Sequence, residues 1–177
     1  HIQIELSSTD RRVDVVAEGY DCVVRTGSLG DSGLVVRPLG ELEQANFVSP
    51  AYIAAHGEPK SLGDLKRHLL IHYNVSSGTR FDAFEYWDGQ QCQRIAMPFR
   101  IAVNNTDAYR TACVSGLGIM QAPYLGARSL VYEGRLVEVM PQYRAPPIAV
   151  SMLYPHRRNL SKRVRIFMDW LAELIRA

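Results

Sequence analysis

The sequence predicts an α/β fold, in which helices cover sheets that contain short buried strands. Three observations predict it. Short apolar, β-branched segments alternate along the chain with segments whose apolar residues recur at helical spacing. The chain opens with a strand-like, a helix-like and a second strand-like segment in succession. It closes with an amphipathic helix that begins at Ser161 and has the most regular pattern in the sequence.

The first three predicted elements follow one another directly. Alternating apolar residues predict a strand over residues 2–6. The polar run 7–10 offers several N-cap side chains for a helix that Gly19 ends. The apolar, β-branched run 21–25 is then typical of a buried strand.

The middle of the chain alternates between strands, loops and short helices. The predicted strands there are 34–36, 45–48, 70–73 and 99–103. A loop rich in Gly, Ser and Asp is predicted at 27–33, and a polar loop rich in Gly and Ser at 74–80. After Ser49 and Pro50 a short helix is expected over 51–56, ending at Gly57, and Ser61 with Asp64 resembles a capping box for a further helix.

Turn and cap residues organise the second half. Asp88-Gly89 predicts a β-hairpin between 85–87 and 90–92. The run 104–106 caps a helix that extends to about Ser115, before Gly116 and Gly118. A short buried segment follows at 119–120, and the last strands are predicted at 136–139 and 148–153.

Composition excludes several classes of protein. The formal net charge of +2 argues neither for nor against a polyanionic partner, and no apolar run is long enough to cross a bilayer. Cys22, Cys92 and Cys113 have neither metal-ligand spacing nor a C-x-x-C motif. We therefore expect a reduced, cytoplasmic setting and no metal or other cofactor.

No catalytic constellation stands out either. The five histidines lack the H-x-x-x-H spacing of a helical metal pair, and His72 is best explained as a structural histidine in an apolar strand. No G-x-S-x-G elbow, phosphate-binding loop or dinucleotide fingerprint is present. Cys113 is interpreted as a small buried side chain rather than a redox sensor, and the basic run 156–163 as a solvated loop and helix start rather than a nucleic-acid site.

Several ordered sequence runs resemble the co-inducer-binding domain of LysR-type transcriptional regulators. They are RVDVVAEGYDCVVRTG (12–27), DSGLVVRPLG (31–40), SPAYIAAHGEP (49–59), DLKRH (64–68), VSGLGI (114–119), GRLV (134–137) and VRIF (164–167). Each run alone is weak, but their order over nearly the whole chain is specific.

The resemblance implies a fold similar to type 2 periplasmic binding proteins, with two Rossmann-like lobes joined by two crossover strands. Lobe I would comprise residues 1–47 and 150–177, and lobe II residues 48–149. The family's DNA-binding winged helix-turn-helix is absent from this chain. So are the first strand and helix of the sensing domain, which leaves lobe I incomplete, and we expect the native polypeptide to be longer.

The resemblance also implies a function. Such a domain binds a small-molecule effector, for example a carboxylate, in the cleft between the lobes and thereby modulates transcription. Its partners would be a second copy, in a homodimer or homotetramer, and DNA only through the missing N-terminal domain, with no membrane involved. The chief alternative is a solute-binding protein of a transporter, which shares the fold. A small α/β enzyme is a third reading, which the missing catalytic constellation disfavours.

Polar residues at strand ends and helix starts are the candidate effector contacts. They are Ser8, Thr9, Arg25, Thr26, Gly27, Asn74, Ser76, Asn104 and Thr106. Arg25 would hold a carboxylate or else form a structural salt bridge. Asn104 and Thr106 begin a helix whose free amides suit an anion. The alternative for every one of them is ordinary capping or turn chemistry.

Overall fold

The computed structural model describes residues 3–27, 29, 33–74, 80–81, 83–155 and 161–176. The chain divides into two compact units. Unit 1 comprises His1–Ser8, Val13–Leu42 and Ile148–Ala177, and unit 2 comprises Thr9–Arg12 and Glu43–Pro147. Among the described residues, no helix is both long and apolar enough to cross a membrane.

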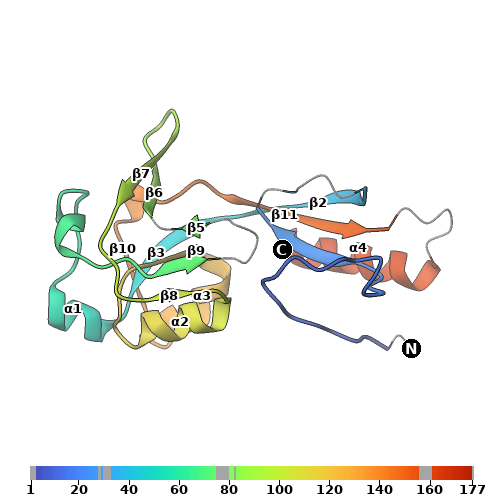
Figure 1. Ribbon diagram of the computed structural model, residues 1–177, viewed down its shortest axis with the longest axis horizontal. Helices are drawn as coiled ribbons and strands as arrows, with labels where there is room; N and C mark the ends of the chain where they lie inside the picture. Colours follow the sequence, from blue (N-terminus) through green and yellow to red (C-terminus); the bar gives the residue numbers. More distant parts are fainter. Residues whose placement is uncertain are drawn as a thin grey trace. The chain divides into compact units, whose positions relative to one another are not determined.

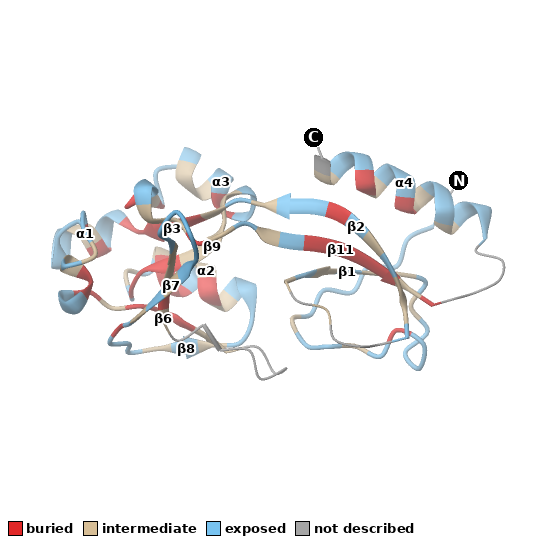
Figure 2. Cartoon of the chain, turned by 90° about the horizontal axis from the view of Figure 1, so that it is seen from above, coloured by how far each residue is buried: buried red, intermediate tan, exposed pale blue. Residues whose placement is uncertain are grey.

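Unit 1 is a three-stranded antiparallel sheet with one long helix against it (Figure 1). The sheet order is β1 (Val23–Thr26), β11 (Ile148–Tyr154), β2 (Val35–Leu42), and the helix is α4 (Lys162–Arg176). Its buried core joins strand and helix residues, namely Leu39, Val150, Met152, Met168 and Ala172. Figure 2 shows the buried positions of α4 on one side of the helix only, as its apolar periodicity predicts. Ser161 Oγ accepts a hydrogen bond from Val164 N (3.3 Å), so the predicted helix start is confirmed.

Two predicted elements of unit 1 are wrong. The strand expected at 2–6 is irregular from Gln3 onward, with Ile4 56% and Leu6 87% exposed, because no strand lies beside it in the described part of the chain. The helix expected before Gly19 is only a turn. The residue that caps this turn is not in the run 7–10. It is Asp14, whose Oδ1 accepts hydrogen bonds from Val16 N (3.1 Å) and Ala17 N (2.9 Å).

Unit 2 contains three small sheets and three α-helices among its described residues. The strands pair as β10 (Val137–Val139), β3 (Gln44–Val48), β9 (Met120–Pro123); as β5 (Arg80–Phe81), β4 (His72–Asn74), β8 (Ala102–Val103); and as the hairpin β6 (Ala83–Trp87), β7 (Cys92–Ala96). The helices are α1 (Pro50–His56), α2 (Thr106–Val114) and α3 (Tyr124–Tyr132), with 3₁₀ turns η1 (Asp64–Arg67) and η2 (Pro141–Tyr143). These strands pair in antiparallel fashion except β4 with β8, which is parallel, and an isolated parallel bridge joins Leu70 to Ile119.

Two apolar clusters hold unit 2 together. The first gathers buried residues of the β3 sheet, α2 and α3, among them Phe47, Tyr109, Cys113, Met120 and Ala127. The second lies around α1, η1 and the hairpin, among them Val48, Tyr52, Leu65, Phe84 and Ile119. Phe47 and Val48 are neighbours on β3 and point to opposite faces, so a single central strand serves both clusters.

In unit 2, the helices α1 and α2 and the β6–β7 hairpin, predicted from capping and turn residues, are confirmed. Ser49 Oγ accepts a hydrogen bond from Tyr52 N (3.2 Å) and Gly57, at φ 78°, ends α1, so that prediction is confirmed. Asn105 caps α2 by accepting a hydrogen bond from Ala108 N (2.9 Å). The 88–89 hairpin is also confirmed, but its loop is longer than predicted, because β7 begins only at Cys92.

Two expectations in unit 2 need correction, and one helix of unit 2 was not expected. Only half of the capping box at Ser61 and Asp64 forms: Ser61 N donates to Asp64 Oδ2 (3.0 Å), but Asp64 N donates to the Ser61 carbonyl and not to its hydroxyl, and the element that follows is only the 3₁₀ turn η1. The strand expected at 99–103 shortens to β8. The helix α3 was not predicted, since it follows Pro123 without a side-chain cap and carries Gly126 in its first turn, which lowers helix propensity.

Candidate functional site

The candidate site lies in unit 2, at the carboxyl ends of the two parallel strands. The register pairs His72 with Ala102 and Tyr73 with Val103, so Asn74 and Asn104 follow at the same edge of the sheet. Helix α2 begins two residues later at Thr106, with its free amides at that edge. The carboxyl edge of parallel strands is where open α/β sheets bind ligands. We call this cluster the α2 site, and it comprises Asp10, Tyr73, Asn74, Asn104 and Thr106.

A carboxylate of the chain itself occupies the start of α2. Asp10 Oδ2 accepts a hydrogen bond from Thr106 N (2.7 Å), and the Thr106 hydroxyl lies 3.3 Å from the same oxygen. The Tyr73 hydroxyl is in turn 3.4 Å from Thr106 Oγ1. A helix N-terminus carries a partial positive charge and unpaired N–H donors, both of which favour an anion. The α2 site therefore has the geometry of a carboxylate acceptor, with Asp10 as its occupant.

The two other polar groups of the site differ in exposure. Asn74 is half-buried, and its Oδ1 is fully buried with no hydrogen-bond donor among the described residues. Asn104 is exposed, and its Oδ1 accepts a hydrogen bond from Asn105 Nδ2 (3.2 Å). Burial raises the pKa of Tyr73 above 10.0, with the hydrogen bond to Thr106 opposing the shift. The phenol is thus neutral near pH 7 and can donate a hydrogen bond.

The candidate residues of unit 1 have local roles. Ser8 is exposed in an irregular segment, and Thr26 is exposed at the end of β1. Arg25 is half-buried and donates from Nη2 to Val13 O (3.3 Å), among other interactions. Gly27 N donates to Ala149 O (2.8 Å), and its φ of 81° favours glycine.

Two remaining candidates do not join the α2 site. Thr9 belongs to unit 2 but is exposed, and its Oγ1 accepts a hydrogen bond from Arg11 N (3.3 Å) within its own turn. Ser76 lies outside the described residues. The structure therefore brings together Asn74, Asn104 and Thr106.

Sequence reasoning missed two members of the α2 site. Asp10 was one of several N-cap candidates for the helix expected after it, yet its carboxylate accepts a hydrogen bond from Thr106 N at the start of α2, 96 positions away. Tyr73 was taken only as part of a buried strand, although its hydroxyl reaches Thr106. A tyrosine directly before the end of a strand that leads to polar residues was the available signal, and nothing near Asp10 pointed to its partner.

Other chemistry finds little support in the described part of the chain. No group of three or more histidine, cysteine and acidic side chains there could hold a metal ion. His72 is buried and stacks on Phe99, with ring centroids 3.8 Å apart. Cys113 is fully buried, which raises the pKa of its thiol to about 12 and keeps it protonated, as expected for a small core side chain. The basic run 156–163 lies outside the described residues over 156–160.

Comparison with known proteins identifies relatives over almost the whole chain. A family model described as the LysR substrate binding domain matches residues 1–176. The HTH-type transcriptional regulator YhjC of Escherichia coli is 42% identical over 175 residues, which are 99% of this chain and 58% of YhjC. An HTH-type transcriptional repressor of Pseudomonas aeruginosa is 32% identical over 173 residues, 98% of this chain and 55% of that protein. The chain thus spans little more than half the length of these relatives.

Solved structures agree with the sequence matches. The regulatory domain of CrgA, a LysR-type transcriptional regulator from Neisseria meningitidis, matches with a TM-score of 0.77 at 25% identity, covering 90% of this chain and 78% of that chain. The full-length virulence activator AphB of Vibrio cholerae matches with a TM-score of 0.77 at 26% identity, covering 98% of this chain and 58% of AphB. These matches confirm the predicted α/β class and its type 2 periplasmic-binding-protein-like fold.

Proposed function

Since the chain belongs to the family of LysR-type transcriptional regulators and represents their effector-binding domain, we propose that it binds a small carboxylate at the α2 site and thereby controls transcription by a longer polypeptide. The observation that supports the carboxylate is the hydrogen bond of 2.7 Å between Thr106 N and Asp10. A carboxylate already sits where the effector's own carboxylate would bind, so an effector would compete with Asp10.

The wider proposal follows from family membership. Contact with DNA would be made by a part of the regulator outside this chain, in the cytoplasm, and the regulator would self-associate as a homodimer or homotetramer. The domain would act by binding and not by catalysis. An effector changes such a regulator only by its difference in affinity between two arrangements of the protein. The family match favours this function over transport of a solute.

Binding of carboxylates to the chain tests the proposal directly. The measurement is the melting temperature in the presence of a panel of small monocarboxylates, with the corresponding primary alcohols as neutral controls. A ligand that binds only the folded state raises the melting temperature with concentration. We expect at least one carboxylate to do so and its alcohol not to. A panel in which no carboxylate shifts the melt would contradict the proposal.

Two substitutions of Thr106 distinguish the contribution of its backbone amide to carboxylate binding from that of its hydroxyl. Thr106→Pro removes the N–H that binds Asp10, and proline is tolerated at the first position of a helix, after an extended residue such as Asn105 (φ −148°, ψ 155°). Thr106→Ala keeps the amide and removes the hydroxyl. We expect Thr106→Pro to weaken carboxylate binding about tenfold, since a charge-assisted hydrogen bond is lost, and Thr106→Ala to change it little. Equal affinities in the two variants would exclude the α2 amide as the binding group.

A further inference from the structure

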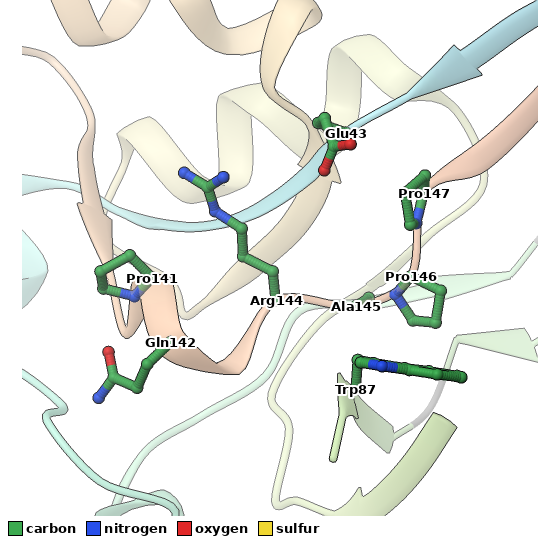
Figure 3. Close-up of a pocket in the computed structure, with 8 residues that line it drawn as sticks. All are labelled: Glu43, Trp87, Pro141, Gln142, Arg144, Ala145, Pro146 and Pro147. Carbon is green, nitrogen blue, oxygen red and sulfur yellow. The ribbon is translucent and has the colours of Figure 1, made fainter. Parts of the chain in front are cut away.

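A pocket lies in unit 2, and none of its lining residues belongs to the α2 site. Its volume is about 380 Å³, and Figure 3 shows the side chains that surround it. They come from the chain between β2 and β3, from the end of β6 and from the segment that follows β10: Glu43, Trp87, Pro141, Gln142, Arg144, Ala145, Pro146 and Pro147. All eight belong to unit 2, so its shape depends on one unit alone.

Hydrogen bonds hold the walls of this pocket in place. Trp87 N donates to Arg144 O (2.9 Å), which ties the hairpin to the segment after β10. Gln44 Nε2 donates to Pro146 O (2.8 Å), which ties that segment to β3. Three separate stretches of the chain are thereby joined around the pocket, and a site built on such a scaffold is largely formed before a ligand arrives.

A buried residue in a strained conformation directly precedes the lining segment. Met140, directly before the lining residue Pro141, has φ 49° and ψ 53°, a left-handed conformation that is uncommon for a residue other than glycine. Asn46 Nδ2 stabilises it by donating to Met140 O (3.1 Å) and to Tyr143 O (3.0 Å). Backbone strain that buried hydrogen bonds maintain is concentrated at binding sites.

Once ion pairs are taken into account, the pocket lining keeps one negative charge, that of Glu43. Arg144 is neutralised by Glu138, to whose Oε1 its Nε donates (2.8 Å). Within the described residues, no basic side chain forms an ion pair with Glu43, the other charged residue of the lining. The Trp87 side chain is 48% exposed and offers its ring to the same pocket. A carboxylate and an indole face together attract an organic cation, the first by charge and the second through its ring quadrupole.

From this arrangement we propose that the pocket is a second ligand site, specific for a small organic ammonium ion. The ammonium group donates to the Glu43 carboxylate, and the hydrocarbon part lies against Trp87 and the proline rings. This site differs from the α2 site in its residues and in the sign of the charge it accepts. Its existence does not depend on carboxylate binding.

The test uses phenethylamine as the cation and phenethyl alcohol as its neutral counterpart. The chain has two tryptophans, so the Trp170→Phe variant leaves Trp87 as the source of a single indole N–H signal in an NMR spectrum of labelled protein. We expect phenethylamine to shift that signal saturably and phenethyl alcohol to shift it far less. No saturable shift with the amine, or an equal response to the alcohol, would overturn the proposal.

A matched pair of variants assigns the charge. In the same background, Glu43→Gln is expected to weaken amine binding about tenfold, because it replaces a charged acceptor by a neutral one. Glu58→Gln removes a carboxylate elsewhere in unit 2 that is not part of the pocket lining, and is expected to leave the affinity unchanged. Glu43 is exposed and contributes no side chain to the cores, so both variants should keep the wild-type melting temperature. If Glu43→Gln binds the amine as tightly as Glu58→Gln does, the site is not the one proposed.

Discussion

Replacing Asp10 by asparagine is expected to change stability and effector affinity in opposite directions. The substitution keeps an oxygen in place to accept the hydrogen bond from Thr106 N (2.7 Å in the wild type) but removes the negative charge. A charge at a helix N-terminus stabilises by about 0.3–1 kcal/mol when partly exposed, as Asp10 is. Converting a charged to a neutral hydrogen bond removes a similar amount. We therefore expect Asp10→Asn to lower the free energy of unfolding by about 1 kcal/mol.

The weaker contact between residue 10 and Thr106 in this variant should also change the affinity for a carboxylate effector. A carboxylate that takes the place of Asp10 must first break the contact with Thr106. In Asp10→Asn that contact is weaker by about 1 kcal/mol, so the carboxylate should bind about fivefold more tightly. The assay is chemical unfolding for the stability and titration calorimetry, with a carboxylate that stabilises the wild type, for the affinity.

Asp14→Asn is the matched control for this prediction. Asp14 also caps a turn, accepting hydrogen bonds from two amides through Oδ1, but it does so in unit 1. Its loss should lower the stability by a comparable amount without changing carboxylate affinity. The reasoning is refuted if Asp10→Asn loses stability but binds the carboxylate no more tightly than Asp14→Asn does.

Three further predictions concern the core of unit 2. A Cβ at Gly118 would lie 2.8 Å from Leu69 O, so Gly118→Ala should destabilise by about 2–3 kcal/mol in chemical unfolding, whereas Gly134→Ala, with open space around it, should lose only about 1 kcal/mol. Tyr52→Phe removes the hydroxyl that lies 3.1 Å from His68 Nδ1 and accepts from Leu69 N (2.9 Å), and we expect it to lower the unfolding free energy by about 1–3 kcal/mol. Burial lowers the pKa of His68 below 6.5, so folding favours the neutral imidazole. The contribution of His68 to the free energy of unfolding should therefore be fully present above pH 6.5 and decrease as the pH falls below that value. The His68→Gln variant should lack this decrease in the unfolding free energy, which would confirm the assignment.

The elements that could be predicted from the sequence are those in which the determining contacts are local. Helix α1 follows from Ser49 and Gly57, which lie at its two ends, and α4 follows from its own apolar periodicity. Alternation over residues 2–6 also resembles a local signal, but a strand requires a hydrogen-bonded neighbour, and none lies beside it in the described part of the chain. Pattern alone cannot report whether that neighbour exists.

The residues of the α2 site also fall into two groups: those that local sequence signals could identify and those that depend on distant contacts. Thr106 and Asn104 could be identified because capping residues precede a helical pattern within a few positions. Asp10 could not, because its choice between a nearby turn and α2 depends on how a segment 96 positions away packs. The parallel register that places Asn74 beside Asn104 is equally non-local, since parallel strands are joined through a long connection.

The proposed ammonium site, the pocket lined by Glu43 and Trp87, shows most clearly why a site is not always predictable from the sequence. Its geometry depends on Asn46, a fully buried polar residue in the middle of β3 that would be expected to weaken the strand. In the folded unit, Asn46 has its hydrogen bonds satisfied: it donates to Met140 O and Tyr143 O and accepts from Gln121 Nε2 (2.8 Å). Loss of this side chain would remove the donor that Asn46 gives to the Tyr143 carbonyl, would leave the Met140 carbonyl with only the hydrogen bond from Tyr143 N (2.9 Å), and would loosen the strained backbone before Pro141. We infer that Asn46 helps to shape the pocket wall, because an apolar residue at this position could not hold that backbone.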